Sequence, residues 1–304
     1  MSKEVSRLPV AVIITTYNDE DYLTQAIESV FAQTPLPEQI IVVDDGSDQN
    51  RASELVRKYV SNPYGVQICC LRKNNGGPSS ARNYGLAHTT EPYVAFLDVD
   101  DKLLPGNIEK KYSTLKELAD EYFGVYSGGI RSDGIQQDFA LIDGAVDACF
   151  LDKNHEGIPG GAPHYLFRRQ SLLDIGGFDE QLTNNEDYDL LIRLLKIKKC
   201  KGIAHTGYYR NIRPNSQSRP ADPIKSLSGV MTFLDKAQEQ GYYTREYLAQ
   251  RRMLAHWVAA KALLKNKRLI GAFLHARRAF AYDGPLSTKQ KLAYMLSFSF
   301  IGGK

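Results

Sequence analysis

The first hundred residues alternate between short apolar runs and amphipathic segments, and this alternation restricts the fold more than any other feature of the chain. Four runs have the length of buried strands and begin roughly every 27 residues, at 10–14, 39–43, 66–71 and 93–97. Apolar residues at helical spacing lie between them, over 23–31, 52–59 and 78–88. Strands and helices that alternate in this way predict right-handed βαβ units and a mainly parallel sheet.

Each apolar run is followed by polar residues. The segments that follow are TTYN at 15–18, DDGS at 44–47, NNGG at 74–77 and, overlapping the last run, LDVDD at 97–101. In a parallel sheet the carboxyl ends of the strands lie at one edge, where open α/β sheets form their ligand sites. We therefore expect these four segments to meet in one crevice, although about 80 residues separate the first from the last.

The fourth run ends in three closely spaced carboxylates, Asp98, Asp100 and Asp101. Such carboxylates raise each other's pKa unless a divalent cation or hydrogen-bond donors neutralise them. Mg²⁺ or Mn²⁺ often binds through one or two carboxylates together with substrate phosphates, which points to a nucleotide diphosphate as a ligand. The alternative is an acidic turn in which one aspartate caps a helix that begins near Pro105 or Gly106.

The regular alternation stops after Asp101. The sequence then predicts a helix at 108–118, a strand at 122–130, a hairpin turn at 132–134, a Gly/Pro-rich loop at 154–163, a short strand at 164–167, a helix at 172–175, a helix capped at 184–187 and a last strand at 203–209. A basic loop with Arg210, Arg213 and Arg219 follows the last strand.

From about residue 223 onward the chain has helical periodicity only. Four helices are predicted, at 227–240, 244–265, 270–282 and 288–300. We therefore expect a first domain at 1–219 and a helical C-terminal region at 220–304. The last segment, KQKLAYMLSFSF, fits either peripheral association with a membrane surface or the closure of a helical subdomain, and packing within the protein is the commoner use of such apolar faces.

Composition excludes some classes of protein. The chain has 304 residues, of which 43% are hydrophobic, so it can bury a large core. The balance of 38 basic and 35 acidic residues is too even to favour a nucleic-acid partner. Four cysteines without metal-ligand spacing favour reduced thiols and a cytoplasmic location, at the inner face of the cell membrane if the C-terminal helices bind lipid. We find no signal-peptide pattern and no apolar run that could span a bilayer.

Six motifs resemble, in their order and spacing, the family 2 glycosyltransferases of the GT-A fold: VIITTYND, IIVVDDGS, NNGGPSSARNYG, AFLDVDD, GGFDE and NEDYDLLIRL. The resemblance covers about residues 8–219. It implies an α/β, Rossmann-like fold with a mixed, mainly parallel sheet flanked by helices and a C-terminal helical extension. It also implies a metal-dependent, inverting transfer of a sugar from a nucleotide-diphosphate donor, here expected to be a UDP-sugar, to a saccharide or lipid-linked acceptor of a surface polysaccharide.

The resemblance assigns several residues to the donor. Thr15 and Tyr17 would contact the nucleobase, Asp45 would bond the uracil edge, and Asp98 would hold the ribose or the hydroxyl groups of the donor sugar. Asn75, in the NNGG segment, is expected in the same nucleotide-sugar site. A flat ring and an accepting carboxylate suit a pyrimidine, although Tyr17 also fits a core position.

The same matching implies the groups that carry the chemistry. Asp100 would bind Mn²⁺ or Mg²⁺ between the two phosphates, with Asp101 as a supporting or capping residue. Arg82 would hold phosphates by its fixed charge, the other explanation being a structural salt bridge. Asp187 matches the general base, with Glu186 as its neighbour at the start of a helix, and a helix cap is the other explanation for Asp187.

One position departs from the family pattern. Members of the family often carry a histidine after the last strand, where this chain has Arg213. Arginine does not replace imidazole as a metal ligand, but it can clamp a diphosphate directly, so we expect Arg213 to close over the donor by its charge. His164 and His205 have no assigned role and are expected to be structural.

Two other functions compete with the transferase. A nucleotidyltransferase also combines a nucleotide with clustered acids, but it needs a basic, Gly-rich phosphate loop near the first strand, where this chain has the acidic TTYNDED. A non-catalytic relative that only binds a nucleotide-sugar would release no UDP from its ligand.

Overall fold

A computed structural model of the protein describes residues 6–139, 141–145, 160–213, 223–282, 288–289 and 291–292. Contacts divide these residues into two compact units, one that runs to Arg213 and one that begins at Pro223. The domain boundary expected at 219–220, most of the Gly/Pro-rich loop and most of the helix expected at 288–300 lie outside the described residues.

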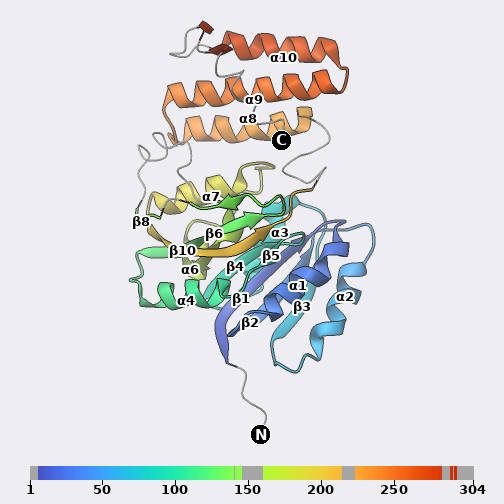
Figure 1. The fold of residues 1–304 in the computed structure, drawn as a ribbon, viewed down its shortest axis with the longest axis vertical. Coiled ribbons are helices and arrows are strands. Elements are labelled where there is room, and N and C mark those ends of the chain that lie inside the picture. Colours follow the sequence, from blue (N-terminus) through green and yellow to red (C-terminus); the bar gives the residue numbers. More distant parts are fainter. Residues whose placement is uncertain are drawn as a thin grey trace. The chain divides into compact units, whose positions relative to one another are not determined.

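The first unit contains all the strands described and the helices between them (Figure 1). In chain order its elements are β1 (Arg7–Thr16), η1 (Glu20–Tyr22), α1 (Leu23–Phe31), β2 (Leu36–Asp44), α2 (Arg51–Val60), β3 (Gln67–Arg72), α3 (Gly77–Ala87), β4 (Tyr93–Asp98), β5 (Lys102–Leu103), α4 (Asn107–Glu117), β6 (Tyr122–Arg131), β7 (Gln136–Gln137), β8 (Asp143–Gly144), η2 (Ala162–His164), β9 (Tyr165–Arg168), α6 (Arg169–Asp174), α7 (Glu186–Leu195) and β10 (Lys199–Arg210).

The strands form one sheet in the order β3-β2-β1-β4-β9-β6-β10-β5, with β7 paired to β6 and β8 to β10. β1, β2, β3 and β4 are parallel, as the alternation of strands and helices predicted. β9 lies between β4 and β6 and is antiparallel to both, whereas β6 and β10 are parallel to each other. The mixed, mainly parallel sheet is thus confirmed, while the central place of β9 and the short β5 were not predicted.

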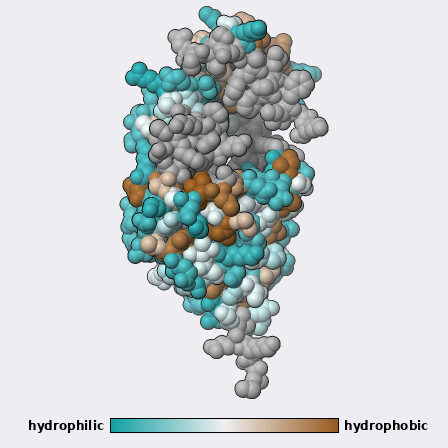
Figure 2. Space-filling view, turned by 60° about the vertical axis from the view of Figure 1, so that its left-hand side comes forward, coloured by the Kyte–Doolittle hydropathy of each residue, from teal (hydrophilic) through white to brown (hydrophobic). Residues whose placement is uncertain are grey.

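Helices cover both faces of the sheet. Alternate residues of a strand point to opposite faces, so each strand contributes side chains to the packing on both sides. Val12 and Ile14 of β1 are fully buried in a cluster that includes Ile27 of α1. Ile13 points to the other face, where a Cβ on Gly85 of α3 would lie 2.5 Å from Ile13 Cγ2. The lack of a side chain at Gly85 therefore allows α3 to pack directly on β1. On the outer surface, hydrophobic residues form separate patches among hydrophilic ones (Figure 2).

The second unit contains α8 (Pro223–Glu239), α9 (Arg245–Lys265) and α10 (Leu269–Ala281), which confirm three of the predicted C-terminal helices. α9 contacts both other helices, and Met253 of α9 packs in one cluster with Ala279 of α10. Thr244 caps α9 by accepting a hydrogen bond from the Tyr247 N–H. In the part of the chain that is described, no helix has the length and apolar character that a bilayer crossing requires.

Candidate active site

The candidate site lies at the carboxyl edge of the parallel strands. In the register of the sheet, Thr15 on β1 is opposite Asp98 on β4, and Thr16 is opposite Asp44 on β2. The polar segments that follow β1, β2 and β4 therefore start at the same level of the sheet. This places them together, as the pattern of strand ends predicted.

The residues expected at the nucleobase lie where β1 ends. Thr15 is half-buried, whereas Tyr17 is 41% exposed. A core position for Tyr17 is therefore wrong, and its ring is free to stack on a flat ligand. The N–H of the next residue, Asn18, donates to Ser47 Oγ at 2.9 Å, which joins the end of β1 to the loop after β2.

Asp45 is buried and ties the NNGG segment to the end of β2. Its carboxylate accepts hydrogen bonds from the backbone N–H groups of Gly76 and Gly77, at 3.0 and 2.7 Å, and from Lys73 Nζ at 2.8 Å. These bonds place a negative charge at the amino end of α3, where the helix dipole favours it. Asn75 is exposed in the same turn. Asp45 thus organises this loop, and its bond to a uracil edge stays a prediction.

Arg82 of α3 joins the end of β4 to the start of α7. Its guanidinium donates to Asp98 at 2.9 Å, to Glu186 at 3.0 Å and to Asp187 at 3.4 Å, and its side chain is only 5% exposed. Burial alone would lower the pKa of Arg82, but the three carboxylates raise it above its ordinary value. The structural salt bridge, which the sequence left open as the other role for Arg82, is thus present. We call these four residues the Arg82 cluster.

Asp187 lies in the first turn of α7, against the segment that precedes β9. Its carboxylate accepts a hydrogen bond from the Ala162 N–H, and a Cβ on Gly161 would lie 3.2 Å from Asp187 Cγ and closer still to Oδ2. Burial raises the pKa of Asp187 to about 7; Arg82 opposes this rise and Glu186 adds to it. A carboxylate with such a pKa is suited to accept a proton near neutral pH. Gly161 and Ala162 were not predicted, because only the fold brings them to α7.

Asp100 lies beside a cation from the end of the first unit. Arg213 Nε donates to Asp100 Oδ2 at 2.6 Å, and its two terminal nitrogens both bond to Asp19, at 2.7 Å for Nη1. The guanidinium also lies 4.7 Å from the centroid of the Tyr22 ring. Burial raises the pKa of Asp100, Asp98 adds to the rise, and Arg213 opposes it. A positive charge is therefore held at the expected metal ligand.

The pairing of Asp19 with Arg213 was not predicted. Asp19 directly precedes η1 but makes no side-chain capping bond to it, and its carboxylate pairs with Arg213 instead. Its position directly after the TTYN strand end is the signal that could have identified it.

Asp101 supports the loop that follows β10. Its carboxylate accepts hydrogen bonds from Tyr208 Oη and from the Asn211 N–H, the latter at 2.7 Å. Burial raises the pKa of Asp101 to about 7. The helix α4 begins after Gly106, and no side chain caps it. The explanation of LDVDD as a helix cap is thus wrong, and Asp101 positions the chain near Arg213.

His164 and His205, the two histidines without an assigned role, have protein contacts of their own. His164 is buried with Nδ1 3.2 Å from the Ser127 carbonyl oxygen, and burial lowers its pKa to about 3. His205 lies 3.4 Å from Lys110 Nζ. Among the described residues, no three His, Cys, Asp or Glu side chains are grouped so that they alone could hold a metal ion.

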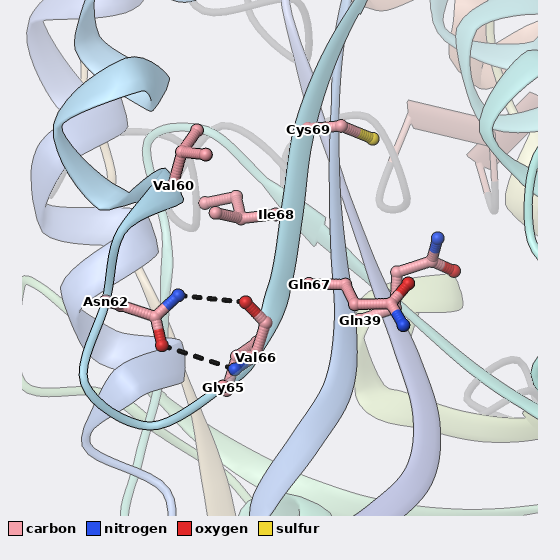
Figure 3. Close-up of a pocket in the computed structure, with 8 residues that line it drawn as sticks. All are labelled: Gln39, Val60, Asn62, Gly65, Val66, Gln67, Ile68 and Cys69. Carbon is pink, nitrogen blue, oxygen red and sulfur yellow. Dashed lines mark hydrogen bonds between the residues drawn. The ribbon is translucent and has the colours of Figure 1, made fainter.

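A cavity of about 420 Å³ lies elsewhere on the sheet (Figure 3). Val66 and Ile68 line it near the amino end of β3, which is the edge opposite to the candidate site. Asn62 closes the turn beside it, with its amide donating to the Val66 carbonyl and its Oδ1 accepting from the Val66 N–H. These contacts stabilise the turn and bring no titratable group to the cavity apart from Cys69.

A mainly parallel sheet flanked by helices, with acidic residues at its carboxyl edge, defines the GT-A class of α/β folds. Two solved structures confirm this class. S. aureus TarS 1–349 in complex with UDP-GlcNAc matches with a TM-score of 0.60 at 19% identity, over 98% of this chain and 93% of that chain. The mannosyltransferase PcManGT from Pyrobaculum calidifontis, in complex with GDP-Man and Mn²⁺, matches with a TM-score of 0.57 at 18% identity, over 98% and 87% of the two chains.

Sequence comparisons show similarity to one family of glycosyltransferases. The model described as "Glycosyl transferase family 2" matches residues 11–156. An uncharacterized glycosyltransferase of Rickettsia typhi, RT0329, is 32% identical over 198 residues, which are 62% of this chain and 59% of the relative. The minor teichoic acid biosynthesis protein GgaB of Bacillus subtilis is 31% identical over 228 residues, which are 72% of this chain and 24% of the relative. Residues 11–156 thus match glycosyltransferase family 2, and the chain spans about three fifths of the Rickettsia relative's length.

Proposed function

We propose that the protein is an inverting glycosyltransferase that moves a sugar from a UDP-sugar to a saccharide or lipid-linked acceptor in surface polysaccharide biosynthesis. The observation that carries the proposal is the Arg82 cluster, in which one buried guanidinium connects Asp98, expected at the donor, to Asp187, expected at the acceptor. Support for UDP comes from the bound donor in the TarS structure, and support for the acceptor class comes from the name of GgaB.

Asp187 is the proposed general base. It takes the proton of the acceptor hydroxyl while that oxygen forms a bond to the anomeric carbon and the bond from this carbon to the diphosphate breaks. The configuration inverts because the attack and the departure occur on opposite sides of the sugar. Glu186 keeps the pKa of Asp187 high, and Arg82 keeps its ionised form in place. Together they poise the base near neutral pH.

The residues at the end of β4 fit a divalent cation that takes most of its ligands from the donor. Asp100 already has a positive charge against it, the guanidinium of Arg213, so this position accepts a cation. Mg²⁺ in particular often binds through one or two carboxylates together with substrate phosphates and water. We propose Asp100 as such a ligand. A metal bound there supplies charge neutralisation of the leaving diphosphate.

The remaining donor contacts come from three strand ends. We propose that Tyr17 stacks on the nucleobase, with Thr15 beside it, and that Asp45 and Asn75 bond the base or ribose from the NNGG turn. Asp45 would then exchange part of its present bonding to Lys73 and the glycine N–H groups for the ligand. Arg213 would leave Asp100 for the diphosphate, where its planar group makes paired, charge-assisted bonds.

We place this reaction in the cytoplasm, at the inner face of the cell membrane. The three cysteines described, Cys69, Cys70 and Cys200, are free thiols, as in proteins of reducing compartments. A lipid-linked acceptor would bring the enzyme to the membrane surface.

The test measures donor binding and turnover separately. UDP-sugars with Mn²⁺ should raise the melting temperature of the protein, since a ligand stabilises the state that binds it. Release of UDP with a saccharide acceptor should fall by roughly 10²–10⁴-fold in Asp187→Asn, while the thermal shift remains. Near-normal turnover would remove Asp187 from the role of base. A thermal shift without any UDP release in the unaltered chain would favour the non-catalytic binding function.

A further inference from the structure

The helix α10 has an apolar face that no described residue covers. Leu269 is 64%, Ile270 80% and Phe273 68% exposed, and they follow one another at the spacing of one helix face. A different face of α10 is buried against α9 through Ala272 and Ala279. The helix therefore packs through its small residues and presents its large ones outward.

Positive charge surrounds this apolar face. Between Tyr247 and Tyr282 the chain has eight Lys and Arg residues and no Asp or Glu, whereas the whole chain has a net charge of only +3. Lys265, Lys267 and Arg268, at the turn between α9 and α10, are all exposed. No carboxylate in the described part of the chain pairs with them. We call residues 264–274 the α9–α10 tip.

We propose that the α9–α10 tip docks on a bilayer of anionic lipids. A helix with large apolar side chains on one face and lysine or arginine beside them lies in the plane of a membrane interface, and anionic headgroups attract the cations. The lack of acidic residues from Tyr247 to Tyr282 favours a negatively charged partner. A protein partner with an acidic surface would also pair with the cations, but such pairing gives no reason for the exposed side chains of Ile270 and Phe273.

This inference does not depend on the proposed transferase activity, because lipid binding is measured without turnover. The full chain is mixed with vesicles of phosphatidylcholine alone or of phosphatidylcholine with phosphatidylglycerol, and the bound protein is sedimented. We expect binding to the phosphatidylglycerol vesicles only, and weaker binding at higher salt. The variant Ile270→Ser/Phe273→Ser should lower the partition coefficient at least about tenfold. Each cation near an anionic surface contributes about fivefold, so Lys267→Glu/Arg268→Glu should lower it at least about twentyfold.

Matched controls lie in the first unit. Ile197→Ser removes another exposed apolar side chain, and Lys116→Glu reverses another exposed cation; both should sediment as the unaltered chain does. Circular dichroism checks that the variants fold, which their exposed positions favour.

Three results would overturn the proposal. The first is equal sedimentation of the tip variants and the unaltered chain. The second is a dimer in light scattering that Ile270→Ser/Phe273→Ser converts to a monomer without any lipid binding, since a second copy would then cover the face. The third is lipid binding only in a chain shortened to Leu292, since the chain's own last residues would then be the cover.

Discussion

Replacement of Gly161 by alanine is expected to disable the proposed base without altering the donor site. The new Cβ would lie 3.2 Å from Asp187 Cγ and well inside contact distance of Oδ2. Because the interior is tightly packed, the carboxylate must withdraw by on the order of half an ångström. The same movement stretches its hydrogen bond from the Ala162 N–H. A misplacement of about 1 Å can cost on the order of 10²-fold in rate, so we expect kcat to fall roughly 10- to 100-fold.

The assay compares kcat, the KM for the donor and the melting temperature across four proteins. These are the unaltered chain, Gly161→Ala, Asp187→Asn and the double variant. If Gly161 acts through Asp187, the double variant should be no slower than Asp187→Asn alone, because residues in contact are not additive. The KM for the donor should stay within about twofold, since Gly161 touches none of the strand ends that hold the donor. Gly271→Ala is the control, because Gly271 lies within the helix α10 and a Cβ there would meet only the end of the Leu263 side chain, at 3.3 Å.

The reasoning fails if Gly161→Ala turns over at the unaltered rate. It also fails if the losses of Gly161→Ala and Asp187→Asn multiply, because Gly161 would then act on some other group. A large change in donor KM with unchanged kcat would place Gly161 at the donor instead of beside the base.

Three further variants test charges of the first unit. In Glu186→Gln the pKa of Asp187 should fall, because the neighbouring negative charge that raised it is removed. The acid limb of the kcat–pH profile should therefore move to lower pH by roughly 0.5–1 pH unit. An acid limb at an unchanged pH would contradict this explanation. In Arg213→Gln the carboxylate of Asp100 loses the cation that lies against it. In an electron paramagnetic resonance titration without nucleotide, Mn²⁺ should therefore bind this variant roughly 3- to 10-fold more tightly than the unaltered chain. An unchanged affinity would show that Arg213 does not compete with the metal. Burial lowers the pKa of Lys111 from 10.5 to about 7. Between these pH values the unfolded chain binds one proton more than the folded chain, so the free energy of unfolding rises with pH over that window. Lys111→Met should abolish this rise when the free energy of unfolding is measured in urea at pH 7 and at pH 10.

The part of the fold that the sequence predicted is the part whose pattern is local. The first four strands and their helices follow from apolar periodicity within each segment, and their shared edge follows from the handedness of βαβ units. β9 was expected as a strand, but its place between β4 and β6 depends on partners about 70 and 40 residues away. β5 has two residues and exists because it pairs with β10. Pairing of this kind leaves no periodic trace in the sequence.

In the candidate site, too, contacts between residues far apart in the chain could not be predicted from the sequence. Asp98, Asp100 and Asp187 could be selected as candidates because acids at strand ends and helix starts are visible in the sequence. The pairing of Arg213 with Asp19 could not, because 194 residues separate them. Charge alone does not choose among the 35 acidic partners available to an arginine. Only the loop after β10, which Asp101 holds, brings this arginine to the end of β1.

The Arg82 cluster gives the two halves of the proposed reaction a physical connection. One guanidinium is shared by the expected donor contact Asp98 and the expected base Asp187. A donor whose hydroxyl groups bond to Asp98 would weaken its hold on Arg82, and Arg82 would then interact more strongly with Glu186 and Asp187. A stronger interaction with Arg82 favours the ionised form of Asp187, so its pKa would fall when the donor binds. The base would therefore become fully ionised at neutral pH only once the sugar to be transferred is in place.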